Sequence, residues 1–207
     1  YLIYGFCGDK MFIIGLTGSS GSGKGYVDSV FEKNNIRCTD TDKIVHKLYE
    51  GKNECTEEIR HSFGDCVIFP DGSVNRKRLG EIVFRERSAL ERLNHIVHRY
   101  VAAVVSDLID QCRKNNEKAF VIDAPMLFES GLDRVCDIKL AVVADEKTKI
   151  ERIMKRDRIS AESAILRLEN QYSDEFFVSN CDFVIHNNTG DDVEKQINDF
   201  IRIYLHI

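Results

Sequence analysis

The stretch Gly15–Gly25 holds the residues whose types and spacing point most directly to chemistry. Its sequence, GLTGSSGSGKG, directly follows the apolar run Met11–Ile14. Three fixed positions of the pattern G-x-x-x-x-G-K-[ST] are present, at Gly18, Gly23 and Lys24. Glycines let a backbone wrap closely around an anion with its N–H groups turned inward, and the start of the next helix adds positive potential. The stretch therefore predicts a phosphate-binding loop, and its place between a strand and a helix argues against a merely flexible turn.

The end of this loop departs from the pattern. Lys24 provides a charge for the β- and γ-phosphates of a nucleotide, but Gly25 stands where a Ser or Thr hydroxyl normally holds magnesium. Phosphate binding is therefore better supported than metal binding. The residues expected to hold the nucleotide are Ser20, Gly21, Ser22, Gly23, Lys24 and Gly25.

Carboxylates follow two of the other expected strands. Asp40 and Asp42 come after the extended segment Ile36–Thr39, and Asp123 ends the apolar run Ala119–Asp123. Ligands of parallel α/β sheets bind outside the carboxyl ends of the strands, so these side chains are placed to act. Asp42 is either a helix N-cap or a base that accepts a proton from a substrate hydroxyl. Asp123 is placed like a Walker-B acid and would bind magnesium directly or through water.

The elements that must position these groups alternate between strands and helices, which indicates an α/β fold with a parallel sheet flanked by helices. From about residue 51 to 111 the pattern becomes purely helical. There, Ser88–Glu91 reads as a capping box that opens a long amphipathic helix. Five strands are expected, at Met11–Ile14, Ile36–Thr39, Ala119–Asp123, Ile138–Val143 and Phe183–Ile185.

Basic residues crowd into one segment after the fourth strand. Arg152, Lys155 and Arg156 fall within little more than one helical turn. Such charges are either a solvated helix surface or a clamp on the migrating charge, provided from a mobile lid.

Composition narrows the class of protein. The chain has 207 residues and a net charge of -5 from interspersed charges, without the basic excess of a protein that binds nucleic acid. Its seven cysteines are scattered without a C-x-x-C pair, which favours reduced thiols in the cytoplasm. No apolar run approaches the roughly 18 residues that span a bilayer, so no membrane partner is expected. Residues 1–10 lack a basic start and are interpreted as an N-terminal extension.

Taken together, the motifs resemble the dephospho-CoA kinase family, whose members phosphorylate the ribose 3′-hydroxyl of dephospho-CoA with ATP. The resemblance spans Met11 to about Leu205 and depends on the shared order of several motifs. They are GLTGSSGSGK from Gly15, DTD at Asp40–Asp42, FG at Phe63, DGSVNR at Asp71–Arg76, LNHIVH at Leu93–His98, PMLFE at Pro125–Glu129, RIMKRD at Arg152–Asp157, Gln171 and NNTG at Asn187–Gly190.

The resemblance implies roles for individual residues. Asp42 matches the family's general base, which favours catalysis over capping. Asp40, Arg76 and His98 match substrate-binding positions, Arg152 and Arg156 match lid positions with a catalytic role, and Asn188 lies in a loop that passes the adenine of ATP.

The resemblance also implies an organisation. A single kinase-like domain is expected over about 11–207, with a P-loop core at about 11–50 and 118–207. A helical CoA-binding insertion would occupy about 51–111, and a lid about 150–175. Two positions depart from the family: Gly25 replaces the usual Ser, and Arg99 replaces a Pro and lets the long helix continue.

The expected function is therefore ATP- and Mg²⁺-dependent phosphorylation of dephospho-CoA, the last step of coenzyme A synthesis, by a cytoplasmic monomer. Two alternatives stay open. One is a P-loop kinase for another small molecule, such as a nucleoside, a nucleotide or a shikimate-like acceptor. The other is a nucleotide- or CoA-binding protein whose catalysis is weakened because Gly25 lacks a hydroxyl.

Overall fold

The computed structural model describes residues 11–205 and places them in two compact units. One unit runs up to Thr39 and resumes at Ile109, and the other is Asp40–Leu108. The expected extension, residues 1–10, lies outside the described residues. The predicted boundaries of the substrate-binding insertion and the lid stay predictions, because compactness does not say what a segment binds.

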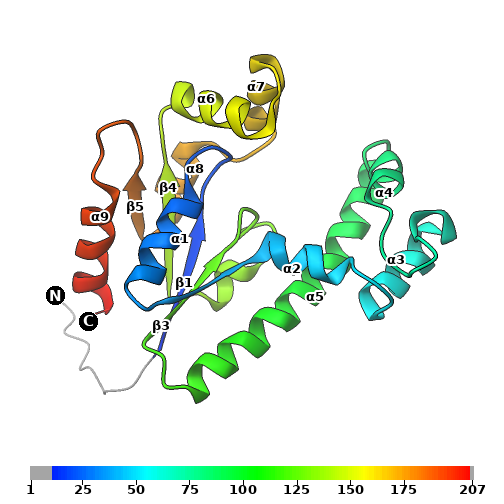
Figure 1. Ribbon diagram of the computed structural model, residues 1–207, viewed down its shortest axis with the longest axis horizontal. Coiled ribbons are helices and arrows are strands. Elements are labelled where there is room, and N and C mark those ends of the chain that lie inside the picture. The colour runs from blue at the N-terminus through cyan, green and yellow to red at the C-terminus, as the bar shows by residue number, and fades with distance from the viewer. Residues whose placement is uncertain (1–10, 206–207) are drawn as a thin grey trace. The chain divides into compact units, whose positions relative to one another are not determined.

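The first unit is built on a five-stranded sheet in the order β2-β3-β1-β4-β5, with parallel pairing of β1 to β3, β1 to β4 and β4 to β5 (Figure 1). Apolar runs produce β1, β3, β4 and β5, as is usual where both faces of a parallel sheet are covered, whereas the edge strand β2 is mostly polar. The predicted α/β class and all five predicted strands are confirmed, although β1 continues three residues beyond its predicted end at Ile14. The strands are β1 (Phe12–Thr17), β2 (Arg37–Asp40), β3 (Ala119–Asp123), β4 (Ile138–Val143) and β5 (Phe183–His186).

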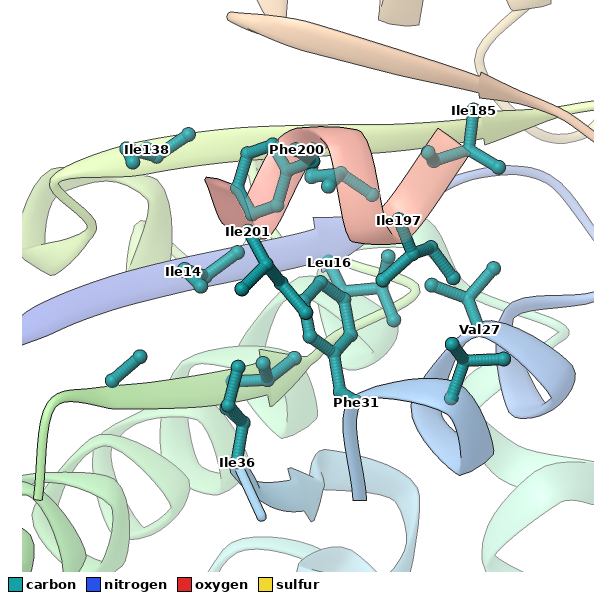
Figure 2. Packing of buried hydrophobic residues seen from close by; sticks show 14 of the residues in the cluster. Ile14, Leu16, Val27, Phe31, Ile36, Ile138, Ile185, Ile197, Phe200 and Ile201 are labelled. Carbon is teal, nitrogen blue, oxygen red and sulfur yellow. The ribbon is translucent and has the colours of Figure 1, made fainter. Parts of the chain in front are cut away.

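Helices α1 and α9 cover one face of this sheet. The apolar residues of each helix recur every three or four positions, which gives each a buried stripe. Figure 2 shows Phe31 of α1 and Phe200 of α9 in one core with Ile14 and Leu16 of β1. The two phenyl rings meet edge to face, with centroids 6.0 Å apart. The helical elements of this unit are α1 (Lys24–Lys33), η2 (Leu132–Val135), α6 (Glu146–Asp157), α7 (Ala161–Glu169), α8 (Asp174–Asn180), α9 (Val193–Phe200) and η3 (Ile201–Leu205).

The second unit is helical, as the pattern predicts. Its elements are α2 (Thr41–Leu48), α3 (Glu54–Phe63), η1 (Asp65–Val67), α4 (Arg76–Val83) and most of α5 (Arg87–Lys114). Asn53 and Thr56 form a reciprocal capping box at the start of α3. Both α3 and α4 pack against η1, and an isolated antiparallel bridge joins Ile68 to Val74.

The start of α5 differs from the prediction. The helix begins at Arg87, so Ser88 lies inside its first turn and the predicted capping box is wrong. Ser88 instead donates its hydroxyl to the Glu86 side chain, and Glu91 pairs with Arg87 at 2.9 Å, one helical turn away. The helix does continue through Arg99, as expected. Among residues 11–205, no helix combines the length and apolar character that a membrane crossing requires.

Candidate active site

The glycines of the loop between β1 and α1 are required by its shape. Gly18, Gly21 and Gly23 have φ values of +139°, +78° and +96°, a region that other residues rarely adopt. A Cβ on Gly18 would lie 2.3 Å from the Val142 carbonyl oxygen. No side chain caps the N-terminus of α1, so an anion can take that place.

Side chains from distant segments fix the carbonyl side of the loop. Arg152 of α6 donates to the Gly21 and Ser22 carbonyls at 3.2 Å each, and to the Asn187 carbonyl at 2.9 Å. Asn187 donates its side-chain amide to the Ser22 carbonyl at 2.7 Å. A trans peptide points its C=O and N–H in opposite directions, so the contacts to the Ser22 carbonyl turn the Gly23 amide to the other side, whereas the Ser22 amide donates to the Ser19 carbonyl at 3.2 Å. The loop is thereby held in an anion-binding shape.

Further hydrogen bonds hold the loop, most of them from side chains more than 120 residues later in the sequence. Gln171 accepts a hydrogen bond from the Ser20 N–H at 2.8 Å and donates to its hydroxyl at 3.1 Å. Ser19 donates to Asp174 at 3.3 Å, and Asp174 also accepts from the buried Lys149 ammonium at 2.9 Å. The Lys24 ammonium donates to the Gly18 carbonyl at 2.8 Å.

These contacts include residues that the sequence did not assign to the site. Lys149 and Asp174 belong to none of the predicted site residues, and Gln171 and Asn187 occur in family motifs without an assigned role. Their separation from the loop is more than 120 positions along the chain, so no local spacing could reveal them. Only the packing of α6, the start of α8 and the end of β5 around the loop brings them together.

The carboxylate of Asp123, the predicted metal ligand, lies at the end of a central strand. It ends β3, in register with Leu16 of β1 just before the loop, and only 8% of the residue is exposed. Thr17 ends β1 and Ser22 lies in the glycine loop. Their hydroxyls are buried without a hydrogen-bond partner among residues 11–205. These are oxygen ligands of the kind that Mg²⁺ prefers, and kinases commonly hold it by one or two carboxylates plus phosphates. The residues present therefore fit magnesium.

The two carboxylates of the D-T-D segment, Asp40 and Asp42, have different surroundings. Asp40, not Asp42, is the N-cap of α2: its Oδ1 accepts from the amides of Asp42 at 2.9 Å and Lys43 at 3.2 Å. The capping interpretation of Asp42 is therefore wrong. Asp42 is exposed in the first helical turn and lines a groove of the second unit that also contains Arg76. The substrate-binding role of Asp40 stays a prediction.

Two further predicted residues, His98 and Arg156, lie on different helices. His98 is half-buried in α5, and burial, aided by His95, lowers the pKa of its imidazole, so it is neutral at pH 7. Arg156 donates twice to Asp157, at 2.8 and 2.9 Å. Arg156, together with Arg167, lowers the pKa of Asp157 to about 2.

Asn188 connects the loop after β5 to the start of α6. Its side-chain oxygen accepts from the Asp145 N–H at 2.7 Å, and its own N–H donates to Asp191 at 2.8 Å. Asn188 also lines a cavity of about 830 Å³ that Ser19, Lys149 and other residues of the first unit share. Its contact with adenine stays a prediction.

The sheet order, with the glycine loop following its central strand β1 and leading into α1, is that of a P-loop nucleotide-binding protein. Comparison with known proteins narrows this class. The model of the family described as dephospho-CoA kinase matches residues 12–192. The chain therefore belongs to the dephospho-CoA kinase family.

Individual relatives agree with this membership. A dephospho-CoA kinase of Fusobacterium nucleatum is 37% identical over 192 residues, which cover 92% of this chain and 97% of that protein. A dephospho-CoA kinase of Lactobacillus johnsonii is 33% identical over 192 residues, which again cover 92% of this chain and 97% of that protein. The solved structure of dephospho-CoA kinase from Campylobacter jejuni gives a TM-score of 0.68 at 26% identity, and the match covers 92% of this chain and 95% of that one.

Proposed function

We propose that this protein transfers the γ-phosphate of ATP to the ribose 3′-hydroxyl of dephospho-CoA, giving coenzyme A and ADP. The observation that carries the proposal is the glycine loop, held in its anion-binding shape by Arg152 and Asn187, in a chain that matches the dephospho-CoA kinase family over residues 12–192. The free state of the six described cysteines agrees with the cytoplasm as the compartment. The working unit in this proposal is a monomer.

A residue of this chain is assigned to each step of the proposed transfer. The loop amides and Lys24 hold the β- and γ-phosphates, Asn188 contacts the adenine, and Arg152 belongs to the lid. The 3′-oxygen attacks the γ-phosphorus, the bond to the β,γ-bridging oxygen breaks, and ADP leaves. Asp42 accepts the proton of the attacking hydroxyl. Arg156 offers positive charge to the transferring group, and Asp40, Arg76 and His98 bind the acceptor.

Magnesium is the proposed cofactor besides ATP, with Asp123 as its protein ligand, directly or through water. When bound, Mg²⁺ neutralises phosphate charge. Because Gly25 provides no hydroxyl, Asp123 is the ion's ligand from the protein and the phosphates of ATP provide the others. We infer a weaker hold on magnesium than a loop ending in Lys-Ser would give.

Substitution of Gly25 by Ser tests this inference. A Cβ at this position meets no atom within 4 Å, so the new side chain fits without displacing a neighbour. We expect the magnesium concentration for half-maximal rate to fall about 3- to 10-fold, because an oxygen ligand is gained. The measurement is the initial rate against magnesium concentration at fixed ATP. Gly25→Ala is the matched control, and identical curves for the Ser and Ala variants would show that the hydroxyl plays no part.

A panel of acceptors tests the proposed function against its alternatives. ADP release is followed with ATP, Mg²⁺ and dephospho-CoA, adenosine, a nucleoside monophosphate or shikimate. We expect the highest kcat/KM with dephospho-CoA, and a preference for any other acceptor would establish a different small-molecule kinase. Calorimetric binding of ATP and dephospho-CoA without turnover would instead establish a binding protein.

A further inference from the structure

A buried ion pair joins two helices of the first unit beside the glycine loop. The Lys149 ammonium on α6 donates to Asp174 Oδ2 on α8 at 2.9 Å, and the two side chains are only 10% and 25% exposed. The other carboxylate oxygen of Asp174, Oδ1, accepts a hydrogen bond from the Ser19 hydroxyl at 3.3 Å. One carboxylate therefore links a buried cation to the beginning of the loop.

The backbone of α6 lies directly against the loop at this point. A Cβ on Gly21 would come within 2.6 Å of the Lys149 carbonyl oxygen and 2.9 Å of the Lys149 Cα, so only glycine lets the two backbones approach this closely. Gly21 belongs to the stretch that wraps the phosphates, between Ser19 and the start of α1. The charges of Lys149 and Asp174 therefore lie next to the phosphate-binding backbone.

The surroundings of this ion pair are acidic. Both of its members line the cavity of about 830 Å³ that also reaches Ser19. Among the described residues that line this cavity, Lys149 is the one Lys or Arg. The carboxylates that line it are those of Asp145, Glu146, Glu169, Asp174 and Glu175. Without the Lys149 ammonium, this side of the loop would present negative charge to a bound triphosphate.

Charges beside the loop are strong enough to decide the affinity for a nucleotide. At an effective dielectric constant of about 20, two unit charges roughly 10 Å apart change an affinity about tenfold. A triphosphate carries several negative charges, so an uncompensated carboxylate at Asp174 would oppose its binding by more than this factor. An uncompensated ammonium at Lys149 would act in the opposite direction.

We propose that Lys149 and Asp174 are positioning residues for the nucleotide, each with its own task. Asp174 holds the Ser19 hydroxyl and so fixes the beginning of the loop, because a carboxylate is a stronger acceptor than a neutral group. Lys149 neutralises this carboxylate, so the phosphates bind beside it without repulsion. The inference rests on the proposed function in one respect, namely that the bound nucleotide is ATP.

Single and double substitutions separate the effect of charge from that of packing, with ATP affinity measured by calorimetry. Lys149→Met keeps the unbranched stem but leaves Asp174 uncompensated, so we expect the affinity to fall at least about tenfold. Asp174→Asn keeps an oxygen for Ser19 and removes the anion, so its affinity should be no more than about twofold below that of the wild type. The double variant carries neither charge, and its affinity should return to within about threefold of the wild type.

The matched control is Lys147→Met, because Lys147 is an exposed residue of α6 that does not line the cavity. It makes the same change in net charge and should leave ATP affinity within about twofold. Unfolding temperatures establish that each variant is folded, and Lys149→Gln, whose amide can donate to Asp174, replaces Lys149→Met if that variant does not fold. In turnover, the loss should appear in KM for ATP, while kcat and KM for dephospho-CoA stay within about threefold.

Recovery of ATP affinity in the double variant would support the inference. Losses of equal size in both single variants, without recovery in the double variant, would show that the pair only holds α6 and α8 together and would overturn it. Equal affinity of Lys149→Met and the wild type would overturn it as well. If the wild type binds ATP but does not phosphorylate dephospho-CoA, the proposed function fails, and the affinities of the variants still decide the inference. If the wild type turns over and the double variant shows no recovery, the inference alone fails.

Discussion

Substitution of Asp42 by Asn is expected to lower kcat for dephospho-CoA about 10²- to 10⁴-fold, the range typical of a lost general base. Asn keeps the size and most of the hydrogen-bonding capacity of Asp but accepts no proton. Asp40, the N-cap of α2, keeps its own bonds to the helix amides, so the fold should be unaffected. ATP affinity should also stay within about twofold. Steady-state kinetics measures kcat, and calorimetric titration measures the affinity for ATP.

The control is Glu50→Gln, which removes an equally exposed carboxylate from the same unit outside the groove. It corrects for the change in net charge. If Asp42→Asn retains more than about a third of the wild-type kcat, Asp42 is not the base, and a structural role in the first turn of α2 becomes the better explanation.

Substitution of Gly23 by Ala is expected to weaken ATP binding at least about tenfold. The new Cβ would lie 2.1 Å from the Asn187 side-chain nitrogen, and the φ of +96° already strains any residue other than glycine. A non-glycine residue in this region costs about 1–3 kcal/mol. The loop must therefore shift, and Asn187 must release the Ser22 carbonyl. Calorimetric titration with ATP measures the loss.

The chain provides its own control two positions away. Gly25→Ala adds the same methyl group where no atom lies within 4 Å and where φ is not positive, so it should retain ATP affinity within about threefold. Equal affinity of the Gly23 and Gly25 variants would contradict the role assigned to the loop's shape.

The parts of the structure that could be predicted are those fixed by local patterns. Apolar runs predict β1, β3, β4 and β5 because a parallel sheet is buried on both faces, and the three- to four-residue spacing of Val27, Val30 and Phe31 predicts α1. The glycine loop could be placed because its spacing is set by the geometry of wrapping an anion.

Helix starts were harder to predict because neighbouring polar residues compete for the same amides. In the D-T-D segment both carboxylates are plausible caps, and only the structure shows that Asp40 takes that place. At α5, the ion pair of Arg87 with Glu91 replaces the capping box expected from Ser88.

The supporting contacts around the loop could not be predicted at all. Gln171, Asp174 and Asn187 reach it from segments that follow the loop by more than 120 residues. The motif list includes Gln171 and Asn187, but their bonds to the loop depend on tertiary packing that no local pattern reveals. The groove that contains Asp42 and Arg76 is a similar case, since α2 and α4 each show an ordinary amphipathic pattern.

The most direct test of the proposed function is the identity of the product. Purified protein is incubated with ATP, Mg²⁺ and dephospho-CoA, and the product is analysed by mass spectrometry and phosphorus NMR. We expect coenzyme A, with one added phosphate on the ribose 3′-oxygen and one ADP formed for each. Absence of product under conditions where another dephospho-CoA kinase turns over, or a phosphate at any other position, would contradict the proposed function.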